Sequence, residues 1–300
     1  MLEKQKILIT GCSSQVGLPV ARRLSRDNEV HGLARFRKGE ERVELEELGV
    51  HCIAVDLASG SFEAVPDDFS YVLHFAVVKT GDWGYDLAAN VEGTGRLMAH
   101  CRGARAFLHC SSAAVYAEGS RKLRVEDAPL GDNHRVLMPT YSICKIGAES
   151  MVRFSARQWG LPATIARLSV PYGDNGGWPW YHLLMMRAGA PIPVHCDGPS
   201  LYNPIHEDDY IAQIPRLLEA ASVPATVVNW GGSQAVSIEE WCEYIGSLTG
   251  LDPKLQRTRD ALRGLPLDPT RMHQLVGATR VDWRDGIRRM IEARSPESLA

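Results

Sequence analysis

The first half of the chain alternates short apolar segments with longer amphipathic ones. The apolar segments, each predicted to be a strand, are residues 6–10, 30–34, 51–55, 71–75, 106–110 and 163–168. Between them lie amphipathic segments predicted to be helices near 16–26, 38–48, 85–102 and 140–159. Strands that alternate with helices form parallel sheets that are covered on both faces, and such strands are almost continuously apolar. The pattern therefore predicts an α/β fold built on a doubly wound parallel sheet.

The amino-acid composition of the chain changes after residue 170. Segments 171–184, 189–210 and 263–275 are rich in proline, glycine and aromatic residues, which is typical of loops that wrap a site. An apolar run at 225–232 still predicts a strand. We therefore expect one domain over 1–170 with a return strand near 225–230, and a smaller C-terminal lobe over 171–300 that is threaded with it.

Composition narrows the class of protein. With 45% hydrophobic and 23% charged residues in 300, the chain is expected to be a soluble globular protein. A net charge of -3 gives no reason to expect nucleic acid or a membrane as partner. The sequence shows no apolar run of about 18 residues and no secretory leader, so we expect a cytoplasmic location. The seven cysteines include no C-x-x-C pair and the histidines no H-E-x-x-H, so no metal site is predicted.

A glycine-rich turn, "TGCSSQVG" at 10–17, joins the first strand to the first helix. Gly11 and Gly17 hold the outer positions of G-x-x-G-x-x-G, but Ser14 stands where the middle glycine is expected. Such a turn directs backbone N–H groups and a helix N-terminus at a pyrophosphate. Tight turns of any kind use glycine, so the motif needs support from elsewhere. We expect Ser14 to cap the helix or to bind phosphate.

The end of the second strand bears on which dinucleotide is bound. The position of the acid that binds the ribose 2′-OH of NAD is occupied by Ala34, and Arg35, Arg37 and Lys38 follow. Cationic donors suit a 2′-phosphate, so NADP(H) is favoured over NAD(H), with NAD kept as the other choice. The alternative is that these three side chains form a solvated helix start.

Tyr141 and Lys145 lie four residues apart, on one face of the predicted helix 140–159. A nearby ammonium group is expected to lower the pKa of the phenol from about 10, which would make Tyr141 a general acid and base. Ser111 and Ser112 end the fifth strand at the sheet edge where open α/β folds bind ligands. An ordinary exposed helix pair is the alternative. Because these residues follow a nucleotide-binding loop in the sequence, we favour a role in the proton transfer that accompanies a hydride transfer.

These motifs together resemble the extended short-chain dehydrogenases/reductases, the NAD-dependent epimerase/dehydratase family. The resemblance runs nearly end to end. It rests on "TGCSSQVG" at 10–17, Asp56 and Leu57, "LHFA" at 73–76, "NVEGTGRLMAHC" at 90–101, "SSAAVY" at 111–116, "YSICK" at 141–145, "ARLSVPYG" at 166–173 and "NPIHEDDY" at 203–210. The family implies a Rossmann-type fold with the dinucleotide in the first domain, and a homodimer that uses helices near 85–102 and 139–159.

The resemblance also assigns roles to residues. It implies that Ser112 orients the substrate oxygen, that Tyr141 passes the proton, and that Lys145 binds the nicotinamide ribose and tunes Tyr141. The expected cofactor contacts are Gly11, Ser13, Ser14, Gln15, Val16, Gly17, Arg35, Arg37, Lys38, Asp56, Leu57, Phe75, Ala76, Val77, Asn90, Cys110, Ser111, Tyr141, Lys145, Leu168 and Val170.

The chain departs from the family where sugar nucleotides bind. Val170 replaces an asparagine and Tyr202 an arginine that hold the sugar diphosphate, which weakens the case for such a substrate. Ala113 and Ala114 replace the acidic pair of the dehydratases, so elimination of water is disfavoured.

In place of these polar groups, the predicted substrate region has aromatic and methionine side chains, which suit a compact carbonyl compound or alcohol. The alternative is that several of them form the core of the smaller lobe. They are Trp178, Trp180, Tyr181, Met185, Met186 and Tyr202. The expected substrate contacts are Val78, Ser112, Ala113, Val170, Trp178, Trp180 and Tyr202, whereas His182 and His206 are expected to be structural.

The preferred hypothesis is an NADP(H)-dependent oxidoreductase acting on a ketone, an aldehyde or a secondary alcohol. The alternatives are an epimerase that retains its cofactor, including one that acts on nucleotide sugars, and a redox-inactive dinucleotide sensor.

Overall fold

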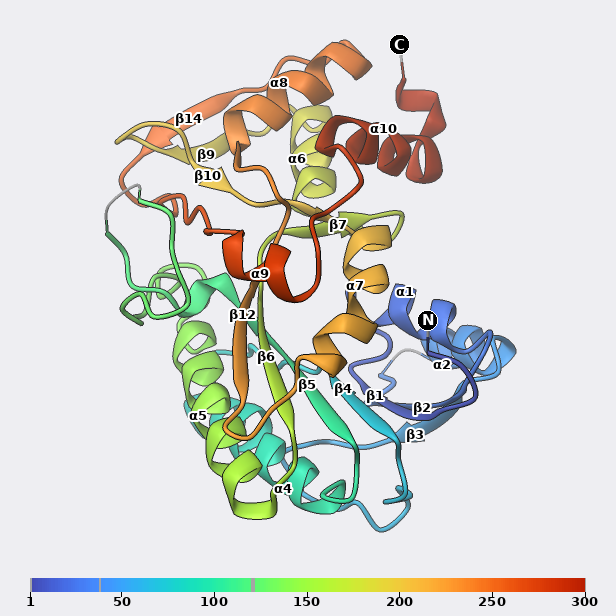
Figure 1. The fold of residues 1–300 in the computed structure, drawn as a ribbon. Helices are drawn as coiled ribbons and strands as arrows, with labels where there is room; N and C mark the ends of the chain where they lie inside the picture. Colours follow the sequence, from blue (N-terminus) through green and yellow to red (C-terminus); the bar gives the residue numbers. More distant parts are fainter. Residues whose placement is uncertain (1, 38, 120–121, 300) are drawn as a thin grey trace.

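The computed structural model describes residues 2–37, 39–119 and 122–299. Within that part of the chain, a seven-stranded sheet forms the centre of the molecule, in the order β12-β6-β5-β4-β1-β2-β3 (Figure 1). Every neighbouring pair is parallel. The strands are β1 (Lys6–Thr10), β2 (Glu29–Ala34), β3 (His51–Ala54), β4 (Tyr71–His74), β5 (Ala106–Ser112), β6 (Ala163–Leu168) and β12 (Thr226–Trp230). The predicted doubly wound parallel sheet is confirmed.

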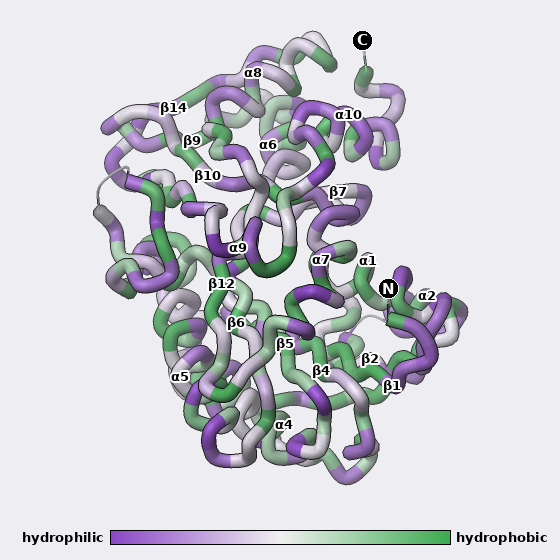
Figure 2. Tube along the Cα trace, in the orientation of Figure 1, coloured by the Kyte–Doolittle hydropathy of each residue, from purple (hydrophilic) through white to green (hydrophobic). Residues whose placement is uncertain are grey.

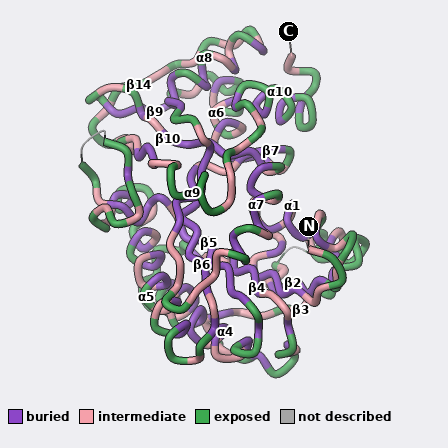
Figure 3. Tube along the Cα trace, in the orientation of Figure 1, coloured by how far each residue is buried: buried purple, intermediate pink, exposed green. Residues whose placement is uncertain are grey.

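Helices cover both faces of the sheet. The helices that pack on it are α1 (Gly17–Leu24), α2 (Gly39–Glu47), α4 (Gly93–His100), α5 (Tyr141–Trp159) and α7 (Glu207–Glu219). Helices α1, α2 and α7 share one apolar core with the sheet, and α4 and α5 share another. The strands are mostly hydrophobic and buried, whereas the outer sides of the helices are exposed (Figures 2 and 3). Burial on both faces explains the continuous apolar runs of the strands.

The single helix expected near 85–102 is divided into three consecutive pieces. They are α3 (Trp83–Leu87), a π-helical turn η1 (Ala88–Glu92) and α4. Asp82 caps α3 by accepting a hydrogen bond from the Tyr85 backbone N–H. Because a π-helical turn inserts one residue into the helical pattern, periodicity alone did not reveal the division.

The C-terminal lobe lies over the carboxyl edge of the sheet and has a core of its own (Figure 1). Its elements are β7 (Pro171–Gly173), β8 (Gly176–Gly177), α6 (Trp178–Arg187), β9 (Ile192–His195), β10 (Leu201–Tyr202), β11 (Ile205–His206), β13 (Val236–Ser237), α8 (Ile238–Thr249), β14 (Leu255–Thr258), α9 (Thr270–Leu275), α10 (Trp283–Arg294) and the 3-10 turn η3 (Pro296–Ser298). The chain leaves this lobe to form α7 and β12 against the sheet and then returns to it.

The proline- and glycine-rich segments of this lobe are more regular than the loops expected from sequence. Residues 178–187, for example, form α6 directly after Gly177, whose φ of +126° turns the chain into the helix. Pro179 lies at the start of α6, where a missing N–H costs nothing. Proline and glycine in this segment therefore mark where a helix starts, and they do not indicate a loop.

No helix in the described ranges is both long and apolar enough to cross a membrane.

Candidate active site

The glycine-rich turn between β1 and α1 is shaped by close approaches of its backbone. Gly11 has a φ of +67°, and a Cβ there would lie 2.7 Å from the Ala76 nitrogen. A Cβ on Gly17 would lie 2.2 Å from the Gly11 carbonyl oxygen. Ser14, between them, accepts a hydrogen bond from the Gly17 N–H at 3.0 Å through its Oγ. The Ser14 hydroxyl thus satisfies the first backbone N–H of α1, which is the helix-capping role expected of it, although the N-cap residue itself is Val16.

One cavity, of about 310 Å³, opens on the outer side of this turn. Of the predicted cofactor contacts it brings together Gly11, Ser13, Ser14, Arg35, Arg37, Asp56, Leu57, Ala76 and Val77; Lys38 lies outside the described residues. Arg35 donates to the Tyr85 hydroxyl at 2.9 Å, and that hydroxyl donates to Asp56 at 2.6 Å. Burial opposes ionisation of Asp56, but the Tyr85 hydrogen bond and the nearby arginines outweigh it and lower its pKa. Two carboxylates, of Glu41 and Asp56, and two guanidinium groups therefore line the same cavity.

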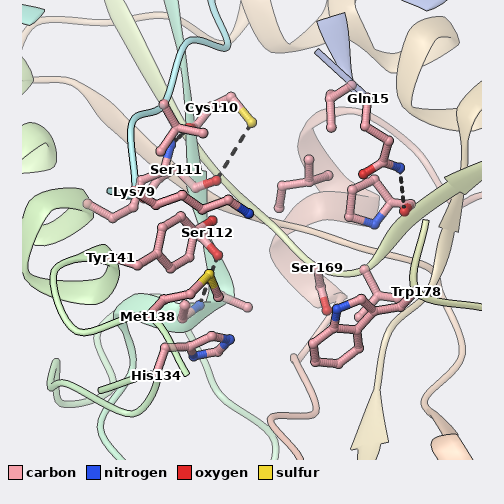
Figure 4. A pocket seen from close by; sticks show the side chains of 18 of the residues that line it. Gln15, Lys79, Cys110, Ser111, Ser112, His134, Met138, Tyr141, Ser169 and Trp178 are labelled. Atoms are coloured by element: carbon pink, nitrogen blue, oxygen red, sulfur yellow. Dashed lines mark hydrogen bonds between the residues drawn. The ribbon is translucent and has the colours of Figure 1, made fainter. Parts of the chain in front are cut away.

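A second cavity, of about 470 Å³, lies between the carboxyl ends of β4, β5 and β6 and the C-terminal lobe. Figure 4 shows Ser112, Tyr141 and His134 on one side of it, with Trp178 and Ser169 opposite. The predicted residues that it brings together are Ser14, Gln15, Val16, Phe75, Val77, Cys110, Ser111, Ser112, Ala113, Tyr141, Lys145, Leu168, Val170, Trp178, Tyr181 and Tyr202. The cavity thus joins the glycine-rich turn, the Ser-Tyr-Lys set and the aromatic side chains of the second lobe.

Helix α5 begins at Tyr141, and Lys145 lies one turn further on. The Lys145 ammonium donates to the Cys110 carbonyl oxygen at 2.7 Å, and burial lowers its pKa. Burial also raises the pKa of Tyr141 to about 12, against a smaller opposing effect of its hydrogen bond with Ser112. The expectation that Lys145 brings the phenol pKa down is wrong for this structure, because burial raises that pKa and the contact that lowers it is the one with Ser112. Tyr141 is therefore a protonated phenol at neutral pH, the form that donates a proton.

A buried ion pair supports this set from behind. Glu149, one turn after Lys145, accepts hydrogen bonds from Arg167 Nε and Nη2, both at 2.8 Å. Ser111 donates to the same carboxylate at 2.7 Å, so its hydroxyl is turned away from the cavity that the residue lines. The neighbouring Ser112 accepts from the Ala114 N–H at 3.1 Å and keeps its hydroxyl at the cavity. Of the two serines, only Ser112 has its hydroxyl placed to meet a ligand.

Four predicted contacts lie elsewhere. Gly17 begins α1 and lines neither cavity. Trp180 does not line the cavity, because it packs under the Arg294 guanidinium, 4.6 Å from the ring centre. Val78 lines the outer cavity and not the substrate side, since Asn90 binds both its N–H, at 2.8 Å, and its carbonyl oxygen, at 2.7 Å. Asn90 itself is buried and lines neither cavity, so its role is to support the chain behind the site.

Other side chains that were weighed from sequence are structural. Met186 is buried in the core of the smaller lobe, with Met185 packed against it. His182 accepts a hydrogen bond from the Trp241 indole N–H at 2.8 Å, and His206 caps α7.

Several lining residues were not singled out from the sequence. They are Lys79, His134, Met138, Ser169, Pro171 and Leu265. Lys79 follows β4 at the carboxyl edge of the sheet, so its position was a usable signal. His134 and Met138 belong to the irregular chain between η2 (Ala113–Val115) and α5, which has no periodicity to place them.

Within the described residues, possible metal ligands gather at His195, Cys196 and Asp197, whose ligand atoms lie within 4.8 Å of one another. Cys196 and Asp197 are exposed, and none of the three lines the cavity of Tyr141.

Comparison with known proteins identifies the family. The model of the NAD dependent epimerase/dehydratase family matches residues 7–231. The chain belongs to this family. The match covers the glycine-rich turn, Ser112, Tyr141 and Lys145. It makes the protein a member of a family of oxidoreductase-type enzymes that use a nicotinamide dinucleotide.

A curated relative comes from Arabidopsis thaliana. It is a trifunctional UDP-glucose 4,6-dehydratase, UDP-4-keto-6-deoxy-D-glucose 3,5-epimerase and UDP-4-keto-L-rhamnose reductase, 27% identical over 96% of this chain. The chain spans 47% of the length of that relative.

Two solved structures share the fold. The UDP-glucuronic acid 4-epimerase of Bacillus cereus, in complex with UDP-glucuronic acid and NAD, has a TM-score of 0.81 at 21% identity and covers 96% of this chain and 98% of its own. MoeE5, in complex with UDP-glucose and NAD, has a TM-score of 0.81 at 25% identity and covers 98% of this chain and all of its own.

Proposed function

We propose that the protein is an NADP(H)-dependent oxidoreductase of the extended short-chain type, which interconverts a ketone or aldehyde and an alcohol. The observation that carries the proposal is the convergence of Ser112, Tyr141 and Lys145 on one cavity that also reaches the phosphate turn at Ser14. The bound nicotinamide supplies or accepts the hydride. The residues of the chain supply the proton, orient the substrate and limit access of water.

In the reducing direction, Tyr141 gives its phenolic proton to the carbonyl oxygen while the carbonyl carbon gains the hydride, and an alcohol results. The raised pKa of Tyr141 keeps that proton in place until the oxygen becomes basic. Ser112 holds the same oxygen through its hydroxyl. In this proposal the buried Lys145, one turn along α5, holds the ribose of the bound nicotinamide.

The preference for NADP(H) rests on the outer cavity. Ala34 offers no carboxylate at the end of β2, while Arg35 and Arg37 line the cavity beside it. The two solved relatives are complexes with NAD, so the choice of cofactor needs a direct test. Fluorescence titration with NADPH and NADH, followed by a panel of carbonyl compounds with the preferred cofactor, provides it. Tighter binding of NADPH is expected, and equal affinity or a preference for NADH would reject this assignment.

An epimerase is the second candidate, because the solved and curated relatives include UDP-sugar epimerases. The substrate side of the cavity argues for a smaller substrate. Val170 and Tyr202 line it, and the Tyr202 hydroxyl donates to the Arg263 carbonyl oxygen at 3.2 Å. The guanidinium group of the same Arg263 forms an ion pair with Asp197 at 2.8 Å. Net consumption of NADPH would favour the oxidoreductase, whereas interconversion of two epimers without it would favour the epimerase. A redox-inactive dinucleotide sensor is the third candidate. It would neither consume NADPH nor interconvert epimers.

The same proposal includes a homodimer in the cytoplasm with a small molecule as its substrate. Support for the dimer comes from the outer side of α5, where Phe154 is 58% exposed. Light scattering on the wild-type protein and on Phe154→Asp tests it; loss of the dimer in the variant is expected, and a monomeric wild type would reject it.

A further inference from the structure

His134 lies beside Tyr141 on a part of the chain to which the proton transfer assigns no role. The segment between η2 and α5 turns back at residues 134–138, where the Leu137 and Met138 N–H groups both donate to the His134 carbonyl oxygen. The imidazole is buried yet lines the cavity, with its ring centre 5.9 Å from that of Tyr141 (Figure 4). It therefore faces the same space as the reacting oxygen.

The hydrogen bonds around His134 determine which ring nitrogen carries the proton. The Asn133 amide nitrogen donates to the Tyr116 carbonyl oxygen, and this fixes the orientation of the amide. The amide oxygen of Asn133 then meets His134 Nδ1. Because an amide oxygen has no proton to give, Nδ1 must carry one. The other nitrogen, Nε2, is left with a lone pair.

Nothing in the described ranges donates to that lone pair. The side-chain hydrogen bond of the imidazole is made by Nδ1. Nε2 has no partner among the described residues and is not enclosed by protein atoms, so it is open to the cavity. Burial, together with the charge of Lys79, lowers the pKa of His134 to about 4. The ring is therefore neutral at pH 7, and Nε2 is a hydrogen-bond acceptor beside the reaction centre.

We propose that His134 Nε2 accepts a hydrogen bond from a hydroxyl group of the substrate next to the reacting carbonyl. The substrate class is then a hydroxy ketone, a hydroxy aldehyde or a sugar, and His134 is the residue that selects it over the deoxy compound. The inference rests on the proposed function for the identity of the reacting group. Its physical basis is that a buried acceptor left without a donor costs free energy, so a ligand that lacks the hydroxyl is bound less well.

Paired substrates test the selectivity. We compare 2-hydroxycyclohexanone with cyclohexanone and with 2-methoxycyclohexanone, which keeps the bulk but has no donor. Wild-type protein should prefer the hydroxy ketone by about 5- to 150-fold in kcat/KM, the range that corresponds to leaving one buried polar group unpaired. His134→Phe should abolish this preference. His134→Gln, whose amide oxygen can replace Nε2, should restore part of it, and an unchanged preference in His134→Phe would overturn the proposal.

A second measurement does not depend on turnover. Nitrogen-15 NMR of the wild-type histidines, with His134 assigned by comparison with His134→Gln, should show a neutral ring protonated at Nδ1. With cofactor present, 2-hydroxycyclohexanone should shift the Nε2 resonance and cyclohexanone should not. A proton on Nε2, or the same response to both ketones, would overturn the proposal. If the NMR result is as expected but none of the ketones is reduced, the proposed oxidoreductase fails while the acceptor site stands.

Discussion

The ion pair behind the active site gives a prediction whose size follows from the structure. The Glu149 side chain is fully buried and that of Arg167 is 3% exposed, and two hydrogen bonds join them. Glu149→Gln removes the negative charge but keeps the shape, so the guanidinium stays buried without a counter-charge. Breaking a buried pair on one side costs about 3–5 kcal/mol. At about 2 °C per kcal/mol for a chain of this size, Tm should fall by roughly 6–10 °C.

Denaturant unfolding of the wild-type protein and the variant measures this loss. The matched control is Glu46→Gln, because Glu46 pairs with Arg42 four residues away and both side chains are 46% exposed. Such a pair contributes at most about 1 kcal/mol, so the control should unfold almost as the wild type does. A loss below about 1 kcal/mol in Glu149→Gln would refute the reasoning, since the carboxylate would then contribute no more than a surface group.

The same pair predicts a dependence on pH. Burial opposes ionisation of Glu149, but its contacts with Arg167 and Ser111 outweigh burial and lower its pKa. A carboxylate with a lowered pKa adds stability above the pKa of the unfolded chain, and this stability is lost as pH falls through the folded value. The stability difference between wild type and Glu149→Gln should therefore be largest near neutral pH and shrink in acid. A difference that stays constant from pH 7 to pH 3 would contradict this assignment.

Three further predictions follow from other sites. Ser14→Gly should bind NADPH about as well as wild type does, whereas Ser14→Val should lose binding in a fluorescence titration, because valine cannot cap α1 and crowds the phosphate turn. Changing Arg35 and Arg37 together to Ala should weaken NADPH by about 10- to 100-fold and NADH much less; equal losses would argue against a 2′-phosphate site. Burial raises the pKa of Glu207 to about 7, so its ionisation costs stability as pH rises from the unfolded pKa through that value. Glu207→Gln should therefore raise Tm more at pH 8 than at pH 5, and the reverse order would refute this.

Local patterns in the sequence were sufficient to predict the sheet and the glycine-rich turn. Five of the six strands of the first half are buried on both faces, so their apolar runs appear in the sequence as they do in the fold, whereas the edge strand β3 is partly exposed. Gly17 is recognisable because the close approach that requires it, to the Gly11 carbonyl oxygen, occurs within one strand-turn-helix unit; Gly11 has a positive φ in the same turn, but its close approach is to Ala76. Tyr141 and Lys145 share one helix face, so their spacing was enough to pair them.

The rest depended on contacts between distant parts of the chain. Trp180 differs from Trp178 only by two positions on α6, but that places it against Arg294 instead of at the cavity. The pKa of Tyr141 depends on burial and on its hydrogen bond with Ser112, which spacing does not reveal. His134 enters the site from an irregular segment, and its protonation depends on Asn133 and on the backbone of Tyr116. Side-chain environments of this kind are determined by tertiary packing.

The most direct test of the proposed chemistry is NADPH oxidation by wild-type protein and by Tyr141→Phe with the best carbonyl substrate of the panel. NADPH binding is measured in parallel by fluorescence. The variant lacks only the phenolic oxygen, so it should bind NADPH within about twofold of wild type, while kcat falls by about 100-fold or more, the size typical of a lost general acid. Full turnover in Tyr141→Phe, with net consumption of NADPH, would contradict the assignment of Tyr141 as the proton donor.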